Sequence, residues 1–407
     1  MFLYGMFDVI TVHYGEVGLK RGRRGYFEGV LMDNLRRSLG GLSYRRVRRV
    51  LGRILVEVDG GDVELYRGVV SRVFGVRWFA FARSVVPRDF DRLVDVVVDE
   101  LRSLSFSTFK VDATRADKSF PYTSMDVNRM VGSVISERLG GRVSMESPDV
   151  TVYIEILGDR FLVYFRRFEG PGGLPVGTGG RVLHLFSGGI DSPVAAWLLM
   201  KRGVFVDYVH FYAVKDVDEA RASKVGELVR FLTYFSYRSR VFYVPFHIFH
   251  LVAAARLDPR METVVFRRFM MRVAEFLARK YGYDAISTGE SLAQVASQTM
   301  QNMISISYGL GFQVLRPLLT YDKEEIINLA KRIGTYELSL KECKDACSII
   351  SLHPRTNVKP EEVLKAEAEI DIDRLIEKTL SETVVVEYEL SHGEIKEQKK
   401  DYKLFHS

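Results

Sequence analysis

The sequence predicts an α/β protein whose C-terminal part is a doubly wound parallel sheet, preceded by two smaller α+β modules. Three observations favour this fold class. The 407 residues exceed what one hydrophobic core normally serves. Residues 170–180, GPGGLPVGTGG, hold six glycines and two prolines, which sustain neither a helix nor a central strand. Upstream of this break short strands and helices are mixed, whereas downstream they alternate regularly.

The N-terminal part predicts two modules that meet near residue 70. β-branched runs predict strands at 54–58, 150–156 and 160–165, and the stretches 24–38, 89–104 and 125–139 read as helices. We place the first module at 1–70, the second at 71–168 and a Gly/Pro linker at 169–181. Such short mixed segments suit α+β units better than a doubly wound sheet.

The C-terminal part predicts a parallel sheet with helices on both faces. Its expected strands are 182–186, 204–211, 241–246, 285–288 and 314–318, and its expected helices are 192–200, 219–234, 262–281 and 323–333. We assign 182–365 to this module. Residues 366–407 form a tail, in which a charged helix after Pro360 leads to an edge strand at 383–390.

The composition predicts a folded protein of the cytoplasm. The apolar fraction of 47% and the charged fraction of 27% lie at the globular average. We see no run of roughly 20 apolar residues that could span a bilayer. Asp8, His13 and Glu16 stand where a signal peptide would need an apolar segment.

Positive charge is concentrated near the N-terminus. The net charge is +6, with 27 basic and 22 acidic residues in 1–180 against 31 and 30 in 181–407. Residues 15–55 alone hold eleven basic and three acidic side chains. This density suits a polyanion such as nucleic acid, but an arginine-rich solvated face would have the same composition. Charge alone does not decide between these interpretations.

The hexad SGGIDS at 187–192 follows the first strand of the C-terminal module. Two glycines let the backbone approach an anion, and amides of the loop and of the next helix can donate to phosphate oxygens. Ser192 and Pro193 predict a helix N-cap and first turn. The pattern is neither GxxxxGK[ST] nor GxGxxG, and glycine-rich turns also occur for structural reasons. We expect a pyrophosphate cradle.

This hexad resembles the PP-loop of the N-type ATP pyrophosphatases, which cleave ATP between the α and β phosphates and transfer AMP to a substrate oxygen. Further segments resemble one family, the tRNA 4-thiouridine synthetases (tRNA sulfurtransferases). They are YGEVGLK at 14–20, the Gly/Pro linker, TGESLAQVASQT at 288–299, LRPLL at 315–319 followed by Asp322 and Lys323, and Cys347 before Ser348. The resemblance covers about residues 9–365.

The resemblance implies a ferredoxin-like domain, a THUMP RNA-binding domain and a PP-loop catalytic domain that together thiolate uridine 8 of tRNA. The implied cofactors are ATP and Mg²⁺, the latter without a dedicated cluster of metal ligands, and related enzymes suggest a homodimer. Asp191 and Lys323 are the implied catalytic residues. A structural turn aspartate and an ordinary surface lysine would give the same sequence pattern.

The expected ATP-binding residues are Ser187, Gly188, Gly189, Ile190, Asp191, Ser192, Gly289, Gln298 and Arg316. The expected RNA-binding residues are Lys20, Arg21, Arg23, Arg24, Lys118, Arg166 and Arg167.

Cys343 and Cys347 are the two cysteines of the chain. A thiolate can carry a terminal sulfur as a persulfide and be recovered by disulfide exchange with a second thiol. Cys347 matches the family's catalytic cysteine, and Cys343 lies one turn earlier if the segment is helical. The best-known bacterial relatives add a rhodanese domain with a further cysteine, which this sequence lacks. Either the two cysteines therefore divide the carrier and resolving roles, or a cysteine desulfurase persulfide or sulfide donates directly.

The family's second role, in thiamine thiazole synthesis, is associated with the rhodanese domain, which counts against it here. Three other classes compete with the thiolation hypothesis. Another PP-loop enzyme, such as a 2-thiouridylase, is disfavoured by the N-terminal modules and the 288–299 segment. A non-catalytic tRNA-binding protein is disfavoured by the intact hexad with Lys323 and Cys347. A THUMP methyltransferase would need a GxG turn that is absent at 187–192.

Overall fold

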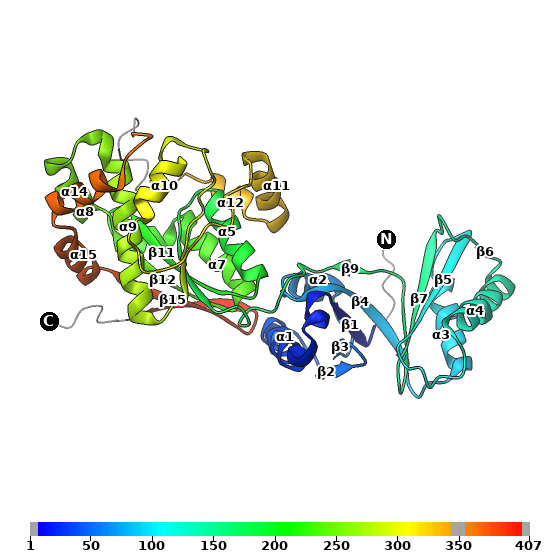
Figure 1. Cartoon of the computed structure of the whole chain (residues 1–407). Helices are drawn as coiled ribbons and strands as arrows, with labels where there is room; N and C mark the ends of the chain where they lie inside the picture. The colour runs from blue at the N-terminus through cyan, green and yellow to red at the C-terminus, as the bar shows by residue number, and fades with distance from the viewer. Residues whose placement is uncertain (1–6, 343–349, 351–354, 401–407) are drawn as a thin grey trace. The chain divides into compact units, whose positions relative to one another are not determined.

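A computed structural model of the chain describes residues 7–342, 350 and 355–400. The chain divides into two compact units, Met1–Pro175 and Val176–Ser407 (Figure 1). The division falls inside the Gly/Pro-rich segment 170–180. Each unit has its own sheet.

The N-terminal unit is built on a nine-stranded sheet within the described residues, in the order β2-β3-β1-β4-β8-β7-β5-β6, with β9 paired to β4. Its strands are β1 (Val9–Tyr14), β2 (Arg46–Val50), β3 (Arg53–Glu57), β4 (Val76–Val85), β5 (Thr108–Arg115), β6 (Arg142–Val143), β7 (Val150–Ile156), β8 (Phe161–Tyr164) and β9 (Phe168–Glu169). Its helices are α1 (Arg24–Ser38), α2 (Val63–Val70), α3 (Phe90–Arg102) and α4 (Ser124–Leu139), preceded by the short 3-10 turns η1 (Glu16–Leu19) and η2 (Arg21–Arg23) and with η3 (Leu39–Gly41) after α1.

The long strand β4 joins the two modules that the sequence predicts. Its first part pairs with β1 and its last three residues, Arg83 to Val85, pair with β8. Phe79 and Phe81 lie in the core under α1 and α2, and Val85 lies in the core under α3 and α4. Because side chains alternate along a strand, these odd-numbered positions place all four helices on one face of the sheet. The expected α+β class is confirmed.

The C-terminal unit is built on a seven-stranded sheet within the described residues, in the order β14-β13-β10-β11-β12-β15-β16. Its strands are β10 (Arg181–Leu185), β11 (Phe205–Tyr212), β12 (Arg238–Pro245), β13 (Ala285–Ser287), β14 (Val314–Leu315), β15 (Val384–Ser391) and β16 (Glu394–Lys400). Its helices are α5 (Asp191–Lys201), α6 (Val217–Ala222), α7 (Lys224–Ser236), α8 (His247–Arg256), α9 (Pro259–Tyr281), α10 (Met300–Ser307), α11 (Lys323–Ile333), α12 (Tyr336–Leu340), α14 (Pro360–Ile370) and α15 (Ile372–Ser381), with the 3-10 turn η4 (Ala296–Gln298).

The strands from β14 to β12 pair in parallel, which confirms the doubly wound sheet. In Figure 1, α9 lies on one face of this sheet, and α5 and α7 lie on the other. The carboxyl ends of β10, β11 and β13 therefore meet at one edge, where ligands of such sheets bind.

Two expected elements of this unit differ from the structure. The single helix expected at 219–234 is two helices, because the chain is extended at Ser223, whose hydroxyl caps α7 by accepting from the Val225 amide. The strand expected at the edge, β15, pairs with β12 on one side and β16 on the other, both antiparallel. The sequence EIKEQKK of β16 is too charged to stand out as a strand, although an exposed edge strand tolerates such charge.

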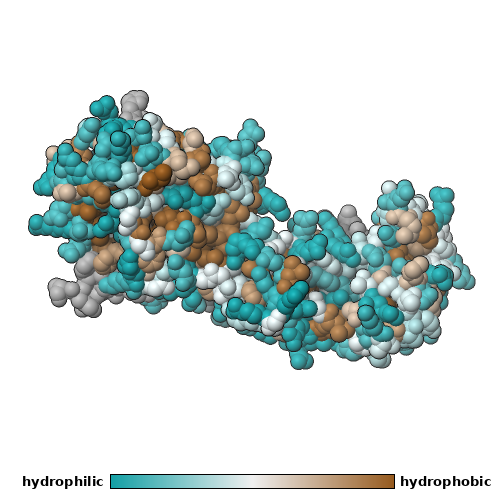
Figure 2. All heavy atoms as spheres, in the orientation of Figure 1, coloured by the Kyte–Doolittle hydropathy of each residue, from teal (hydrophilic) through white to brown (hydrophobic). Residues whose placement is uncertain are grey.

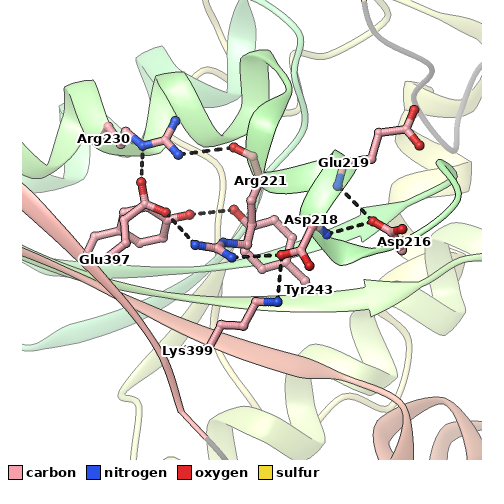
Figure 3. Close-up of polar contacts among 9 residues, drawn as sticks. Asp216, Asp218, Glu219, Arg221, Arg230, Tyr243, Glu397 and Lys399 are labelled. Atoms are coloured by element: carbon pink, nitrogen blue, oxygen red, sulfur yellow. Dashed lines mark hydrogen bonds and ion pairs between the residues drawn. The ribbon is translucent and has the colours of Figure 1, made fainter.

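The hairpin β15–β16 is fastened to α6 and α7 by ion pairs (Figure 3). Glu397 of β16 pairs with Arg230 and, at 2.9 Å, with Arg221. Asp218 of α6 accepts from Arg221 at 2.9 Å and from Lys399 at 2.7 Å. Burial would raise the pKa of Glu397, but the hydrogen bonds from the two arginines outweigh it and the pKa is lowered. The C-terminal strands thus belong to the same folded unit as β10 to β14.

Candidate functional site

The phosphate loop 187–190 connects β10 to the first turn of α5. The N-cap of α5 is Ile190, which provides no side-chain hydrogen bond to the helix amides. The first N–H groups of α5 are therefore free of a capping side chain and can bind an anion. The prediction that Ser192 is the N-cap is wrong, because Ser192 is the second residue of the helix. Its hydroxyl accepts a hydrogen bond from the Ser187 amide at 3.2 Å.

A cavity of about 520 Å³ opens beside this loop, a size that suits a nucleotide. Its lining combines polar and apolar residues. The lining includes six of the expected ATP-binding residues, Ser187, Gly189, Asp191, Ser192, Gly289 and Gln298. The apolar lining residues include Phe211, Phe266, Met270, Met271, Ile306 and Ile350. The expected residues Gly188, Ile190 and Arg316 are not among the residues lining it.

Gly289 brings the segment after β13 against α5. A Cβ atom at this position would lie 2.9 Å from the Cα and 3.0 Å from the backbone nitrogen of Ser192. Neither backbone atom can move aside as a flexible side chain could. The absence of a side chain at residue 289 therefore allows the two loops that flank the cavity to touch.

Asp191 and Lys323 are 132 residues apart in sequence but in contact in the fold. The Lys323 ammonium lies 2.7 Å from Asp191 Oδ1. Lys323 is the first residue of α11, which begins with a capping box between Asp322 and Glu325. The second oxygen of Asp191 accepts from Gln294 Nε2 at 2.7 Å. Both carboxylate oxygens are thus held at the mouth of the phosphate loop.

Glu290 anchors another part of the cavity wall. Arg267 Nη1 and Arg316 Nε each donate to its carboxylate at 2.8 Å, and the Thr288 hydroxyl donates at 2.9 Å. Burial would raise the pKa of Glu290, but the two guanidinium groups outweigh it and lower that pKa. Arg316 also donates to Ser307 Oγ at 2.6 Å, so the structure places it behind the wall of the cavity.

Four buried polar atoms of the cavity wall have no hydrogen-bond partner among the described residues: Thr263 Oγ1, Arg267 Nε, Gln294 Oε1 and Gln298 Oε1. Leaving such an atom unpaired costs about 1–3 kcal/mol, so these atoms are expected to bond to ordered water or to a polar ligand. Sequence reasoning missed Thr263, Arg267 and Gln294. Gln294 lies inside the segment 288–299, whereas Thr263 and Arg267 lie on a long helix whose facing direction the sequence does not reveal.

Cys343 and Cys347 lie outside the described residues. Ile350, which follows them, is buried and lines the cavity. Lys341, which precedes them, is paired with Glu227 of α7. The described residue before this segment therefore contacts α7, and the described residue after it lines the cavity.

The basic segment at the start of α1 is mainly exposed, and hydrophilic colours predominate around it in Figure 2. Arg21 and Arg23 are exposed, and the Arg23 guanidinium lies 5.3 Å from the Tyr26 ring centre. Lys20 pairs with Glu16 at 3.3 Å. Arg24 differs from these, because it donates to Glu28 at 2.9 Å and to the Tyr14 hydroxyl at 2.7 Å. Arg24 therefore contributes to the fold as well as to the charge.

The other expected RNA-binding residues, Lys118, Arg166 and Arg167, are exposed in the same unit. The Arg166 guanidinium lies 5.0 Å from the Phe168 ring centre. The Arg167 guanidinium lies 4.6 Å from the ring centre of Trp78 and 4.0 Å from that of Tyr153. These contacts with aromatic rings keep both charges at the surface with reduced side-chain freedom.

Within the described part of the chain, no helix is both long and apolar enough to cross a membrane. No group of three or more His, Cys, Asp or Glu side chains among the described residues is arranged to hold a metal ion.

The parallel sheet, the phosphate loop and the cavity beside it define a protein of the doubly wound α/β class with an N-terminal α+β unit. Three family models match the chain. They are described as the ThiI ferredoxin-like domain (residues 9–80), the THUMP domain (87–166) and thiamine biosynthesis protein (ThiI) (177–372).

Similar proteins identify the family. The chain is 37% identical over 383 residues to a probable tRNA sulfurtransferase of Thermoanaerobacter sp. strain X514, covering 94% of this chain and all of that protein. A probable tRNA sulfurtransferase of Moorella thermoacetica is 38% identical, with 94% and 98% covered. The crystal structure of a 4-thiouridine synthetase–RNA complex with bound ATP superposes with a TM-score of 0.84 at 34% identity, covering 93% and 99%. The chain belongs to the tRNA sulfurtransferase family, which confirms the resemblance noted from the sequence motifs.

Proposed function

We propose that this protein is an ATP-dependent tRNA sulfurtransferase that makes 4-thiouridine at position 8 of tRNA. The observation that carries the proposal is the cavity lined by the phosphate loop, by Asp191, whose carboxylate is paired with Lys323, and by four residues with an unpaired polar atom. The similarity to a synthetase solved with RNA and ATP supports the same function.

The proposed reaction has two steps. Uracil O4 attacks the α-phosphorus of ATP and pyrophosphate leaves, which turns O4 into a good leaving group. A sulfur nucleophile then attacks C4, and AMP leaves with the former O4. The loop 187–190 and the first turn of α5 bind the phosphates, and Lys323 neutralises charge on the departing pyrophosphate. Asp191 offers the oxygen ligand that Mg²⁺ prefers, and that ion would neutralise further phosphate charge.

We propose Cys347 as the sulfur carrier and Cys343 as its resolving partner. Cys347 precedes Ile350 of the cavity wall by three residues, a span of at most about 11 Å of extended chain. The terminal sulfur of a Cys347 persulfide would attack C4. The Cys343 thiolate would then attack the carrier sulfur, releasing the thiolated uridine and leaving a Cys343–Cys347 disulfide for external reduction. A cysteine desulfurase persulfide passes its terminal sulfur to the Cys347 thiolate, or sulfide attacks the Cys347 sulfur of the Cys343–Cys347 disulfide, which leaves a Cys347 persulfide and a free Cys343 thiolate. We propose that the enzyme works in the cytoplasm as a homodimer.

The test incubates the full chain with unmodified tRNA, ATP, Mg²⁺ and sulfide, followed by mass spectrometry of the tRNA nucleosides. We expect 4-thiouridine at position 8 and one pyrophosphate per nucleoside. Formation of 2-thiouridine instead would indicate a 2-thiouridylase, and tRNA binding without pyrophosphate release would indicate a non-catalytic binding protein.

Cysteine variants test the sulfur route. Cys347→Ser is expected to stop thiolation with every sulfur source while pyrophosphate release continues. Cys343→Ser is expected to allow one turnover from a preloaded persulfide and then to stall unless another thiol is added. Multiple turnovers by Cys347→Ser with free sulfide would show that sulfide attacks the adenylated uridine directly, and the carrier role would be wrong.

A further inference from the structure

A buried histidine lies directly beneath the phosphate loop and has no part in the proposed reaction. His184 is on β10, three residues before Ser187, and its side chain is fully buried. The groups it contacts among the described residues are Ser192, Ser287 and the rings of Phe186 and Tyr208. A buried imidazole surrounded by uncharged groups is expected to be neutral, and burial lowers its pKa to about 4.

The hydrogen bonds of His184 define its tautomer. Nε2 lies 3.1 Å from the carbonyl oxygen of Ser192 and 2.9 Å from Ser192 Oγ. A carbonyl oxygen only accepts, so Nε2 carries the proton and donates to Ser192. Nδ1 is then the acceptor and receives the hydroxyl of Ser287 at 2.9 Å. Ser287 is the register partner of His184 on the neighbouring strand β13.

This tautomer also saturates the Ser192 hydroxyl. A serine hydroxyl has one donor and two acceptor positions. Ser192 Oγ accepts from the Ser187 amide at 3.2 Å and from His184 Nε2, and it donates to the Leu185 carbonyl at 3.3 Å. The last residue of β10, the first residue of the loop and the first turn of α5 are thus joined through one hydroxyl that His184 orients.

The position of Ser192 links these contacts to the geometry of the proposed ATP site. Its backbone atoms form the uncapped start of α5, and the segment at Gly289 packs directly against them. A shift of Ser192 would therefore move both the first amides of α5 and the segment at Gly289 that packs against them.

We infer that His184 is a positioning residue for ATP, which fixes the phosphate loop by donating from Nε2 to Ser192 while accepting from Ser287. The inference rests on the proposed function only in taking ATP as the ligand of the cavity. Residue 184 touches no reacting atom, so its effect acts through the position of residues 187–192.

The experiment measures ATP affinity by calorimetry on the full chain, with thermal unfolding measured in parallel. His184→Leu removes both hydrogen bonds at similar volume, and we expect ATP to bind at least tenfold more weakly. In His184→Gln, the side-chain amide can still donate to Ser192, and we expect affinity within about threefold of the wild type. The double variant His184→Leu with Ser192→Ala should bind ATP no more weakly than the weaker single variant, because both break the same link.

Ser239→Ala is the matched control. Ser239 is a buried hydroxyl of the same sheet, bonded to Ser236 Oγ at 3.0 Å and Thr233 Oγ1 at 3.2 Å, and it is not among the residues that line the cavity. It should lower the melting temperature without changing ATP affinity. If His184→Leu fails to fold, the ATP affinities of the two single variants Ser192→Ala and His184→Gln provide the same comparison. The first variant breaks the link and the second keeps it.

Equal ATP affinity in folded wild-type, His184→Leu and Ser192→Ala proteins would overturn the inference. Loss of affinity in His184→Gln as large as in His184→Leu would also overturn it, because the hydrogen bond to Ser192 would then not be the cause. A wild-type protein that binds ATP but forms no 4-thiouridine would overturn the proposed function and leave the role of His184 intact.

Discussion

The ATP cavity and the basic surface of the N-terminal unit use charge in opposite ways. In the cavity, charged groups are paired with one another and largely buried, as in the Glu290 cluster with Arg267 and Arg316. Around α1, Arg21 and Arg23 project into solvent. The charged side chains of the cavity are fixed by their partners before a ligand binds. The exposed arginines around α1 instead attract a polyanion through the electric field of side chains that remain mobile.

This difference separates the two activities experimentally. A change in the cavity should alter the chemistry or the stability of the C-terminal unit, and it should hardly affect RNA binding. A change on the basic surface should alter RNA binding in a salt-dependent manner and leave ATP chemistry intact. The following experiments are ordered from the largest expected effect to the smallest.

The largest effect is expected for Asp191→Ala and Lys323→Ala. Each removes one half of a 2.7 Å ion pair at the phosphate loop, and pyrophosphate release should fall by about a thousandfold or more. Filter binding should show tRNA affinity within about twofold of the wild type. Lys331→Ala, on the exposed side of α11, is the control and should keep full activity. A loss of tRNA affinity as large as the loss of activity would contradict the division of labour.

The next effect concerns stability. Glu290→Gln leaves two arginines of the cavity wall without their charge partner, and the free energy of unfolding should fall by about 3 kcal/mol. Because the folded state lowers the pKa of Glu290 below its usual 4.5, its contribution is present above that pH and is lost as the pH falls through the folded pKa. Urea unfolding of both proteins at pH 7 and pH 4 measures this. A difference that grows toward pH 4 would contradict the ion-pair explanation.

RNA binding by residues 1–175 should depend strongly on salt. If four phosphates are neutralised, affinity should fall about a hundredfold between 50 and 200 mM salt, because bound cations are released from the RNA. Circular dichroism establishes that the fragment is folded. An RNA affinity that does not change with salt concentration, or no binding by a folded fragment, would contradict the electrostatic explanation.

The smallest effect compares two adjacent arginines. Arg23→Ala should weaken tRNA binding a few-fold and reduce the slope of the salt dependence by about one, without altering the melting temperature. Arg24→Ala should also lower the melting temperature of the N-terminal unit, since Arg24 bonds Glu28 and Tyr14. Identical melting temperatures for the two variants would contradict the assignment of Arg24 to the fold.

The sequence predicted the elements whose pattern is local. The strand at 150–156 and the helix at 323–333 coincide with β7 and α11, because β-branched runs and capping residues mark them directly. The hexad 187–192 was recognisable because its glycines and the helix after it are contiguous. The break between α6 and α7 was missed, since a single serine marks it.

What could not be predicted depends on contacts between distant segments. Arg267 is 23 residues from Glu290, and Gln294 is 103 residues from Asp191, so their pairing appears only when the sheet edge assembles. The misplaced cap at Ser192 has the same origin. Its hydroxyl has a partner in His184 eight residues away, and this tertiary contact replaces the local capping bond.

The antiparallel hairpin β15–β16 affects the order in which the protein folds on the ribosome. β15 pairs along β12 in the middle of the C-terminal sheet, and Glu397 ties β16 to α6 and α7. The sheet that carries the ATP cavity is therefore completed only after residue 400 has left the exit tunnel, whereas the sheet of residues 9–169 is complete much earlier. During synthesis, β12 remains an open edge while about 140 further residues are added. A nascent chain stalled before residue 384 would therefore present a folded N-terminal unit beside an unfinished catalytic sheet.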